Sequence, residues 1–167
     1  MQVLSWSLPI KKGYRGTMDM IEEQYKDVAA LVESSIQIVK QMGLKVVSMQ
    51  GRHVKLLMPL KNNINHVGTM YAGSLYTLGE IMGGAIFLAS FDIGKYYPLV
   101  KDVQIRYRRP ATTDITVETT LSEDQVEQIQ KELEEKGKAD FNLDLELIDA
   151  NGEVVALLKG IWQGRKY

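Results

Sequence analysis

Residues 67–91 read VGTMYAGSLYTLGEIMGGAIFLASF, the most apolar stretch of the chain, and Glu80 carries its only ionisable carboxylate or amine. Three structures suit such a segment: a membrane-spanning helix, a core helix wrapped by a sheet, or a core helix that also carries a functional site. A membrane span needs about 20 apolar residues. Five glycines (68, 73, 79, 83 and 84) and a central glutamate argue against a span and favour a core helix.

The glycines and Glu80 both need a physical reason to lie in such a helix. A glycine inside a helix costs up to about 1 kcal/mol relative to alanine, but small residues let surrounding strands approach closely. A carboxylate in apolar surroundings is either paired or desolvated. Desolvation would raise the pKa of Glu80 toward the range of a general base. The alternative is a Glu80 side chain that reaches solvent or pairs with a lysine or arginine.

Before this segment, apolar side chains recur every three or four residues, which predicts one amphipathic helix over about 18–42 that ends at Gly43. The apolar stripe consists of Ile21, Tyr25, Val28, Val32, Ile36 and Val39. Alternating apolar and polar residues then predict two strands, over about 44–50 and 53–60.

After the apolar segment, the sequence predicts four more strands and a short helix. One strand stops before Pro110, and a second covers about 115–121. Ser122 and Gln125 form a capping-box pattern that opens a helix ending at Gly137. Strict alternation over 139–147 predicts a half-buried strand, and the Asn151-Gly152 pair predicts a type I′ turn into a last strand over about 153–162. The short connections favour an antiparallel sheet in a single α+β domain, residues 1–167.

Composition excludes several classes of function. The 167 residues include 20 basic and 21 acidic side chains, so the net charge of −1 offers no electrostatic attraction for nucleic acid or an anionic membrane. The chain has no cysteine and only two histidines, which argues against metal centres and thiol nucleophiles. The N-terminus lacks the pattern of a secretory signal, so we expect a cytoplasmic protein.

The stretch Asn65-His-Val-Gly-Thr-Met-Tyr71-Ala-Gly-Ser-Leu-Tyr-Thr-Leu-Gly-Glu80 resembles the hotdog-fold acyl-CoA thioesterases of the phenylacetate-degradation type. Within them it is closest to a branch with a Gly-Thr-Met-Phe/Tyr-Ala-Gly-Ser/Ala-Leu signature. The corner Tyr107-Arg-Arg-Pro-Ala111 is similar to one in the same family. The resemblance implies that residues from about 43 to 163 form a hotdog core, in which a curved antiparallel sheet wraps around one long helix. The helix over about 18–42 would be an N-terminal addition to this core. It also implies a homodimer with active sites at the subunit interface, and leaves open whether two dimers form a tetramer.

The resemblance also implies roles for individual residues. Glu80 would be the base or nucleophile toward the thioester carbon, and Asn65 would orient the thioester or the water. The backbone amides of Ala72 and Gly73, at a helix N-terminus, would form the oxyanion hole, where free N–H groups favour negative charge. Substrate contacts would come from Tyr71, Ser74 and His66, and the coenzyme A phosphates would meet Arg106, Arg108 and Arg109. No metal and no cofactor is expected, since coenzyme A is part of the substrate.

The sequence departs from the family pattern at two places, and three functions stay open. The family's His-Gly-Gly is Tyr71-Ala72-Gly73 here, and Val100 stands near a position that often carries a hydroxyl. The leading hypothesis is a thioesterase that acts on a small-molecule acyl-CoA or on an acyl-carrier-protein thioester. One alternative is a non-catalytic acyl-CoA or lipid binder. Another is a hydroxyacyl dehydratase-like enzyme that uses His66 and Glu80.

Overall fold

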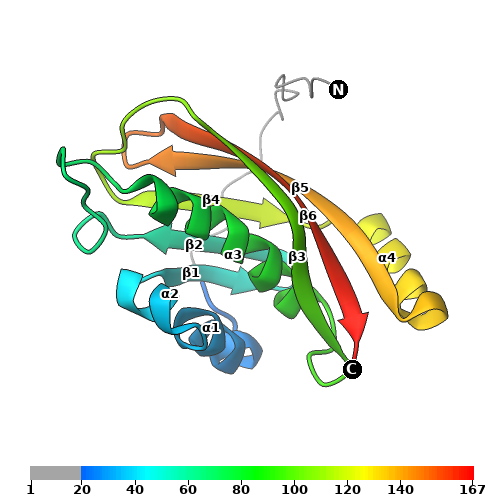
Figure 1. Cartoon of the computed structure of the whole chain (residues 1–167). Helices are drawn as coiled ribbons and strands as arrows, with labels where there is room; N and C mark the ends of the chain where they lie inside the picture. Colours follow the sequence, from blue (N-terminus) through cyan, green and yellow to red (C-terminus); the bar gives the residue numbers. More distant parts are fainter. Residues whose placement is uncertain (1–19) are drawn as a thin grey trace, which may run out of the picture.

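A computed structural model describes residues 20–167, in which six strands form one curved antiparallel sheet around a central helix (Figure 1). The sheet order is β1-β2-β4-β5-β6-β3, and every neighbouring pair is antiparallel. The predicted α+β class and the predicted order of elements are confirmed. The strands are β1 (Lys45–Gln50), β2 (His53–Met58), β3 (Tyr96–Tyr107), β4 (Ile115–Thr120), β5 (Lys138–Asp149) and β6 (Val154–Lys166).

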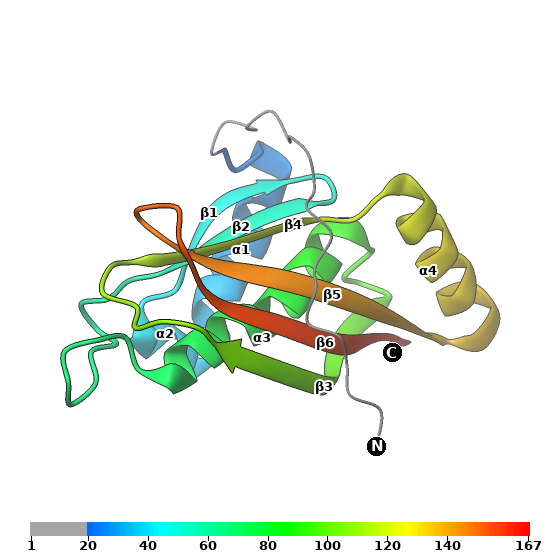
Figure 2. The ribbon, with the colours of Figure 1, turned by 90° about the horizontal axis from the view of Figure 1, so that it is seen from above.

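The apolar segment forms α3 (Ala72–Ser90), which lies across the concave face of the sheet (Figure 2). It packs against β2, β3, β4, β5 and β6. Among the described residues, α3 is the one helix long and apolar enough to cross a membrane, but 56% of its apolar window is buried inside the fold. This burial supports the prediction of a core helix.

Two glycines of α3 show why small residues are needed there. A Cβ on Gly79 would lie 2.3 Å from the Cδ1 atom of Leu158, and a Cβ on Gly83 would lie 2.1 Å from the ring of Trp162. Both partners project from β6. The helix therefore approaches this strand more closely than any larger residue would allow, as the sequence pattern predicts.

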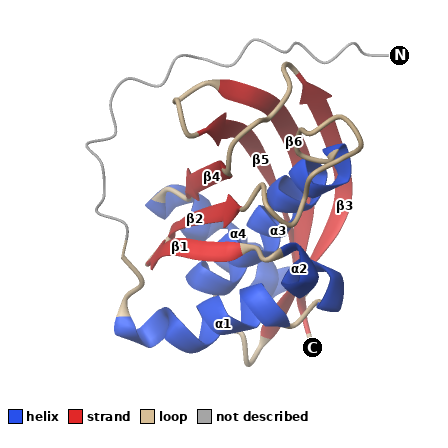
Figure 3. Ribbon diagram, turned by 90° about the vertical axis from the view of Figure 1, so that its left-hand side faces the viewer, coloured by secondary structure: helices blue, strands red, loops and turns tan. Residues whose placement is uncertain are grey.

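The prediction of one long N-terminal helix is wrong. The described part consists of a short 3₁₀ turn η1 (Glu23–Tyr25), α1 (Lys26–Ser34) and α2 (Gln37–Met42), and the predicted residues 18–19 lie outside the described range. Ile36 is extended, with φ −104° and ψ 114°, so α2 turns away from α1 (Figure 3). The Ser34 hydroxyl donates to the Ala30 carbonyl at 2.6 Å, a contact that bends helices. The predicted end at Gly43 is confirmed by its φ of 78°.

Local signals after α3 predict the structure well, with one exception. The helix α4 (Glu123–Lys136) begins with the predicted capping box, and β5 buries the predicted alternate residues. The type I′ turn is wrong, because Gly152 has φ 83° but Asn151 does not have a positive φ. Instead the Asp149 carboxylate accepts from the N–H groups of Asn151 and Glu153, at 2.9 and 2.8 Å, and shapes the turn.

Within the sheet, the hydrogen-bonded pairing between neighbouring strands is shortest between β4 and β5. Their hydrogen-bonded register covers only two residue pairs, Ile115 with Asp149 and Thr116 with Ile148. By contrast, β5 and β6 pair along almost their whole length. The sheet therefore has two parts, β1-β2-β4 and β5-β6-β3, which diverge from this seam in Figure 2 while α3 packs against both.

Candidate functional site

Glu80 lies half-buried near the middle of α3, in a cavity of about 170 Å³ that we call the Glu80 cavity. The cavity is bounded by α3, by the junction of α1 and α2, by the first half of β3 and by β6. Its apolar walls include Val32, Ile36, Ile81, Leu88, Leu99 and Trp162. The broken N-terminal helix thus contributes to the surroundings of Glu80, which the sequence did not indicate.

The Glu80 carboxylate makes no hydrogen bond and no ion pair with any residue of the described range 20–167. Burial raises its pKa above the ordinary value, because the charged form loses hydration and gains no partner. The alternative of pairing with a lysine or arginine is therefore not what the structure shows. A desolvated, unpaired carboxylate beside a cavity is suited to accept a proton from water.

The indole of Trp162 holds the helix at this position. Its Nε1–H donates to the backbone carbonyl of Glu80 at 3.1 Å, and the residue is only 1% exposed. The ring lies between Gly83 of α3 and Gly160 of its own strand, where added Cβ atoms would approach it to 2.1 and 2.4 Å. Glu80 is therefore carried by a rigid contact between helix and sheet.

The N-terminus of α3 presents two free amides. Tyr71 is the N-cap residue and provides no side-chain cap. The N–H groups of Ser74 and Leu75 donate to the Tyr71 carbonyl, whereas those of Ala72 and Gly73 have no acceptor among residues 20–167. Free N–H groups at a helix N-terminus favour developing negative charge. The Tyr71 ring packs over Gly73, where a Cβ would come within 2.3 Å of it.

Tyr76 and Tyr107, which were not predicted as site residues, also lie at this end of α3. The Tyr107 hydroxyl, at the end of β3, donates to the Ala72 carbonyl at 3.0 Å. Burial raises the pKa of Tyr107, and the neighbouring Tyr71 and Tyr76 raise it further. A phenol near a helix N-terminus has no sequence motif, so only the fold could reveal it.

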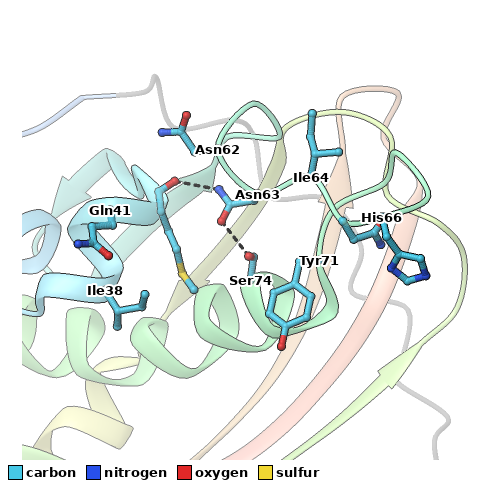
Figure 4. Close-up of a pocket in the computed structure, with 10 residues that line it drawn as sticks. Ile38, Gln41, Asn62, Asn63, Ile64, His66, Tyr71 and Ser74 are labelled. Carbon is cyan, nitrogen blue, oxygen red and sulfur yellow. Dashed lines mark hydrogen bonds between the residues drawn. The ribbon is translucent and has the colours of Figure 1, made fainter.

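A second, larger cavity of about 530 Å³ lies between α2, the loop 61–71 and the start of α3 (Figure 4). We call it the loop cavity; Tyr71, His66, Asn65 and Ser74 line it, so four predicted site residues are brought together there. Asn63, to which no sequence signal pointed, is 5% exposed, and its side-chain oxygen accepts a hydrogen bond from the Ser74 hydroxyl at 2.8 Å. Its amide nitrogen donates to the carbonyls of Met42 and Pro59. The Ser74 hydroxyl is therefore engaged in a buried structural contact.

Asn65 shapes its own loop. Its side-chain oxygen accepts from the N–H groups of Val67 and Thr69, and its amide nitrogen donates to the Thr69 hydroxyl at 2.9 Å. An asparagine amide has two N–H donors, and the second has no partner among the residues that the structure describes. Asn65 can therefore still donate one hydrogen bond to a bound molecule.

Within one chain, the predicted catalytic groups are not brought together. Gly73 and Glu80 are seven residues apart on α3, which corresponds to about 10 Å along the helix axis. Asn65 and His66 line the loop cavity, whereas Glu80 lines the other cavity. A carbonyl held by the α3 amides is thus beyond reach of the carboxylate on the same helix.

The three predicted arginines lie at the end of β3. Arg106 is on the strand, and Arg108 and Arg109 follow it, all three exposed. Arg109 forms an ion pair with Glu153, and the Arg108 N–H donates to the Val155 carbonyl at 2.8 Å. Tyr107, in the same run, contacts Ala72 at the N-terminal end of α3. Because side chains alternate along a strand, Arg106 points to the opposite face of the sheet from Tyr107.

Comparison with known proteins supports one family. Residues 25–163 match the family described as "Putative thioesterase (yiiD_Cterm)". A solved structure from Pseudomonas aeruginosa, described as a "Probable Thioesterase", is 42% identical, with a TM-score of 0.80 and coverage of 89% of this chain and 99% of that one. No curated protein matches the chain.

Two more distant solved structures share the fold. A structure from Shewanella oneidensis, described as a "putative thioesterase", is 23% identical, with a TM-score of 0.67 and coverage of 82% of this chain and 94% of that one. A thioesterase from Haemophilus influenzae is 12% identical, with a TM-score of 0.65 and coverage of 83% and 88%. The chain therefore belongs to the yiiD_Cterm family of thioesterases, which are hydrolases, and has the hotdog fold.

Proposed function

We propose that the protein hydrolyses an acyl thioester of coenzyme A or of an acyl-carrier protein, with Glu80 as the general base. The observation that carries this proposal is the unpaired, desolvated carboxylate of Glu80 beside an apolar cavity. A pure binding tunnel would gain nothing from such a carboxylate, because burying it is unfavourable.

In the proposed reaction, Glu80 takes a proton from water as the water oxygen attacks the thioester carbon. The carbonyl oxygen becomes an oxyanion, which the amides of Ala72 and Gly73 stabilise. Collapse of this intermediate breaks the carbon–sulfur bond and releases the carboxylic acid and the thiolate. The thiolate takes up the proton that Glu80 received, which restores the carboxylate. Asn65 donates its remaining N–H to the thioester or to the water.

A second copy of the chain would bring a Glu80 carboxylate close to the amides of Ala72 and Gly73. Because the amides and Glu80 are about 10 Å apart along one helix, we propose that α3 of one subunit supplies the amides and α3 of the other supplies the carboxylate. The edge strand β3 is suited to join the subunits, because it leaves Leu99 and Val100 each 45% exposed. The other edge strand, β1, is partly covered by a backbone bridge from Ile21 to Met49.

We expect the protein to sediment as a homodimer at micromolar concentration, because a strand edge with exposed apolar side chains favours pairing with a second copy. Sedimentation equilibrium gives the mass directly, against 18.9 kDa for one chain. A monomer at that concentration would contradict both the dimer and the shared active site.

Replacing Arg106, Arg108 and Arg109 together with alanine should weaken binding of coenzyme A thioesters far more than binding of short pantetheine thioesters. The guanidinium groups suit the phosphates of coenzyme A, which the pantetheine compounds lack. The measurement is KM for matched thioesters that carry the same acyl group. Equal losses for both kinds of thioester would contradict the assignment.

A hydrolysis screen tests the function itself. The purified protein is incubated with acyl-coenzyme A thioesters of different size, and the released thiol is measured with a thiol reagent. The chain has no cysteine, so the protein gives no background. Tight binding of acyl-coenzyme A without any turnover would instead support the non-catalytic binder.

A further inference from the structure

The glycines of α3 differ in what surrounds them. An added Cβ would meet the ring of Tyr71 at Gly73, the Leu158 side chain at Gly79 and the ring of Trp162 at Gly83, in each case at 2.3 Å or less. At Gly84 the nearest atom would be Cγ of Pro98 at 3.9 Å, an ordinary van der Waals contact. A Cβ would therefore displace a neighbouring side chain at three of these positions, but not at Gly84.

Gly84 nevertheless stands in the interior of a helix. Glycine destabilises a helix interior relative to alanine, and its usual compensation is close packing, which this position lacks. Its backbone is helical and needs no positive φ. Within one chain, what a glycine provides here is the space that the missing side chain leaves.

That space belongs to the Glu80 cavity. Gly84 lies four residues after Glu80, so both face the same side of α3, and both line this cavity with Leu88 one turn further on. Across the cavity stand Pro98, Leu99 and Ile36. A side chain at position 84 would project into the cavity beside the carboxylate.

We propose that Gly84 determines which acyl groups the protein accepts, by keeping open an apolar pocket next to Glu80. This inference rests on the proposed thioesterase function. A cavity of about 150 Å³ holds a benzene molecule, and the Glu80 cavity has a volume of about 170 Å³. The substrate class is therefore thioesters whose apolar acyl group is about the size of a hexanoyl chain or a benzoyl ring.

The test compares wild type, Gly84→Ala and Gly84→Leu with acetyl-, hexanoyl-, benzoyl- and decanoyl-coenzyme A. We expect wild type to prefer the hexanoyl and benzoyl thioesters. Gly84→Ala should lower kcat/KM for these two by about tenfold, the lower range for one methylene-sized change in an apolar pocket, and change acetyl turnover little. Gly84→Leu should leave acetyl as the only good substrate.

Two controls separate the pocket from general effects of the substitutions. Ala30→Leu adds apolar bulk to the exposed face of α1 and should leave the acyl preference unchanged. The thermal midpoint of Gly84→Ala should equal or exceed that of wild type, because alanine favours the helix. A lost preference in an unfolded variant would be recognised by this measurement.

The outcomes distinguish this inference from the function on which it rests. If wild type hydrolyses thioesters and the folded Gly84 variants keep its acyl profile, the pocket assignment is wrong and the thioesterase function stands. If wild type prefers decanoyl-coenzyme A, the proposed size class is wrong. If wild type hydrolyses none of the thioesters, the proposed function fails and this inference fails with it.

Discussion

Replacing Glu80 with glutamine should lower kcat by about 100-fold or more, the usual contribution of a general base. Glutamine keeps the size and shape of the side chain but cannot accept the proton from water. The fold should be retained, because the carboxylate of Glu80 forms no hydrogen bond or ion pair within residues 20–167. The measurement is steady-state hydrolysis of the best thioester from the screen, together with the circular dichroism spectrum of the variant.

The pH dependence gives the same group a second signature. Only ionised Glu80 acts as a base, and burial raises its pKa. The rate should therefore rise with pH along a limb centred above the value of about 4.3 for a free glutamate. A raised pKa in the folded state also means that stability falls as pH rises through that pKa. In Glu80→Gln, the rise of the rate with pH along this limb should disappear. The fall in stability that the ionisation of Glu80 causes should disappear as well.

A matched control is Glu127→Gln, which neutralises an exposed glutamate of α4 and should retain the wild-type rate and pH profile. Wild-type turnover by folded Glu80→Gln would contradict the assignment of Glu80 as the base.

Replacing Gly83 with alanine should lower the free energy of unfolding by about 1–3 kcal/mol, the usual cost of overpacking. The new methyl group would lie 2.1 Å from the Trp162 ring. The ring cannot move easily, because it rests over Gly160 and donates a hydrogen bond to the Glu80 carbonyl. At this chain length each 1 kcal/mol lowers Tm by about 2–4 °C, so differential scanning calorimetry measures the effect readily.

The adjacent Gly84→Ala is the control for this prediction, since it makes the same chemical change at the next residue of α3 without a close neighbour. A Tm for Gly83→Ala equal to that of Gly84→Ala would show that the Trp162 contact does not limit the packing of α3.

Local sequence signals predict the parts of this fold that depend on neighbouring residues. The capping box at Ser122 and the alternation in β5 are such parts, and both are confirmed. The helix break at Ile36, by contrast, is not determined by neighbouring residues in the sequence. Val28, Val32, Ile36 and Val39 keep a helical period through it, yet Ile36 is 47% exposed while the other three are buried. Packing of α1 against α3 and β1 outweighs this period.

The candidate site divides in the same way. Glu80 could be found because a single carboxylate in an apolar helix is visible in the sequence. The role of Asn63 could not be predicted from the sequence. Asn62, Asn63 and Asn65 are the same residue type in one loop, and only the fold shows that Asn63 is the one buried against Ser74. Tyr107 was missed for a similar reason, since its contact with Ala72 joins residues 35 positions apart in the chain.

The two-pair seam between β4 and β5 has a consequence for how the domain unfolds. Backbone hydrogen bonds contribute little cohesion across it, so the two parts of the sheet are held together mainly by the side chains of α3, which contact both. Cooperative unfolding of small domains depends on such shared contacts. The core helix therefore couples the two parts into one folding unit, and a loosened helix would let them exchange amide hydrogens independently.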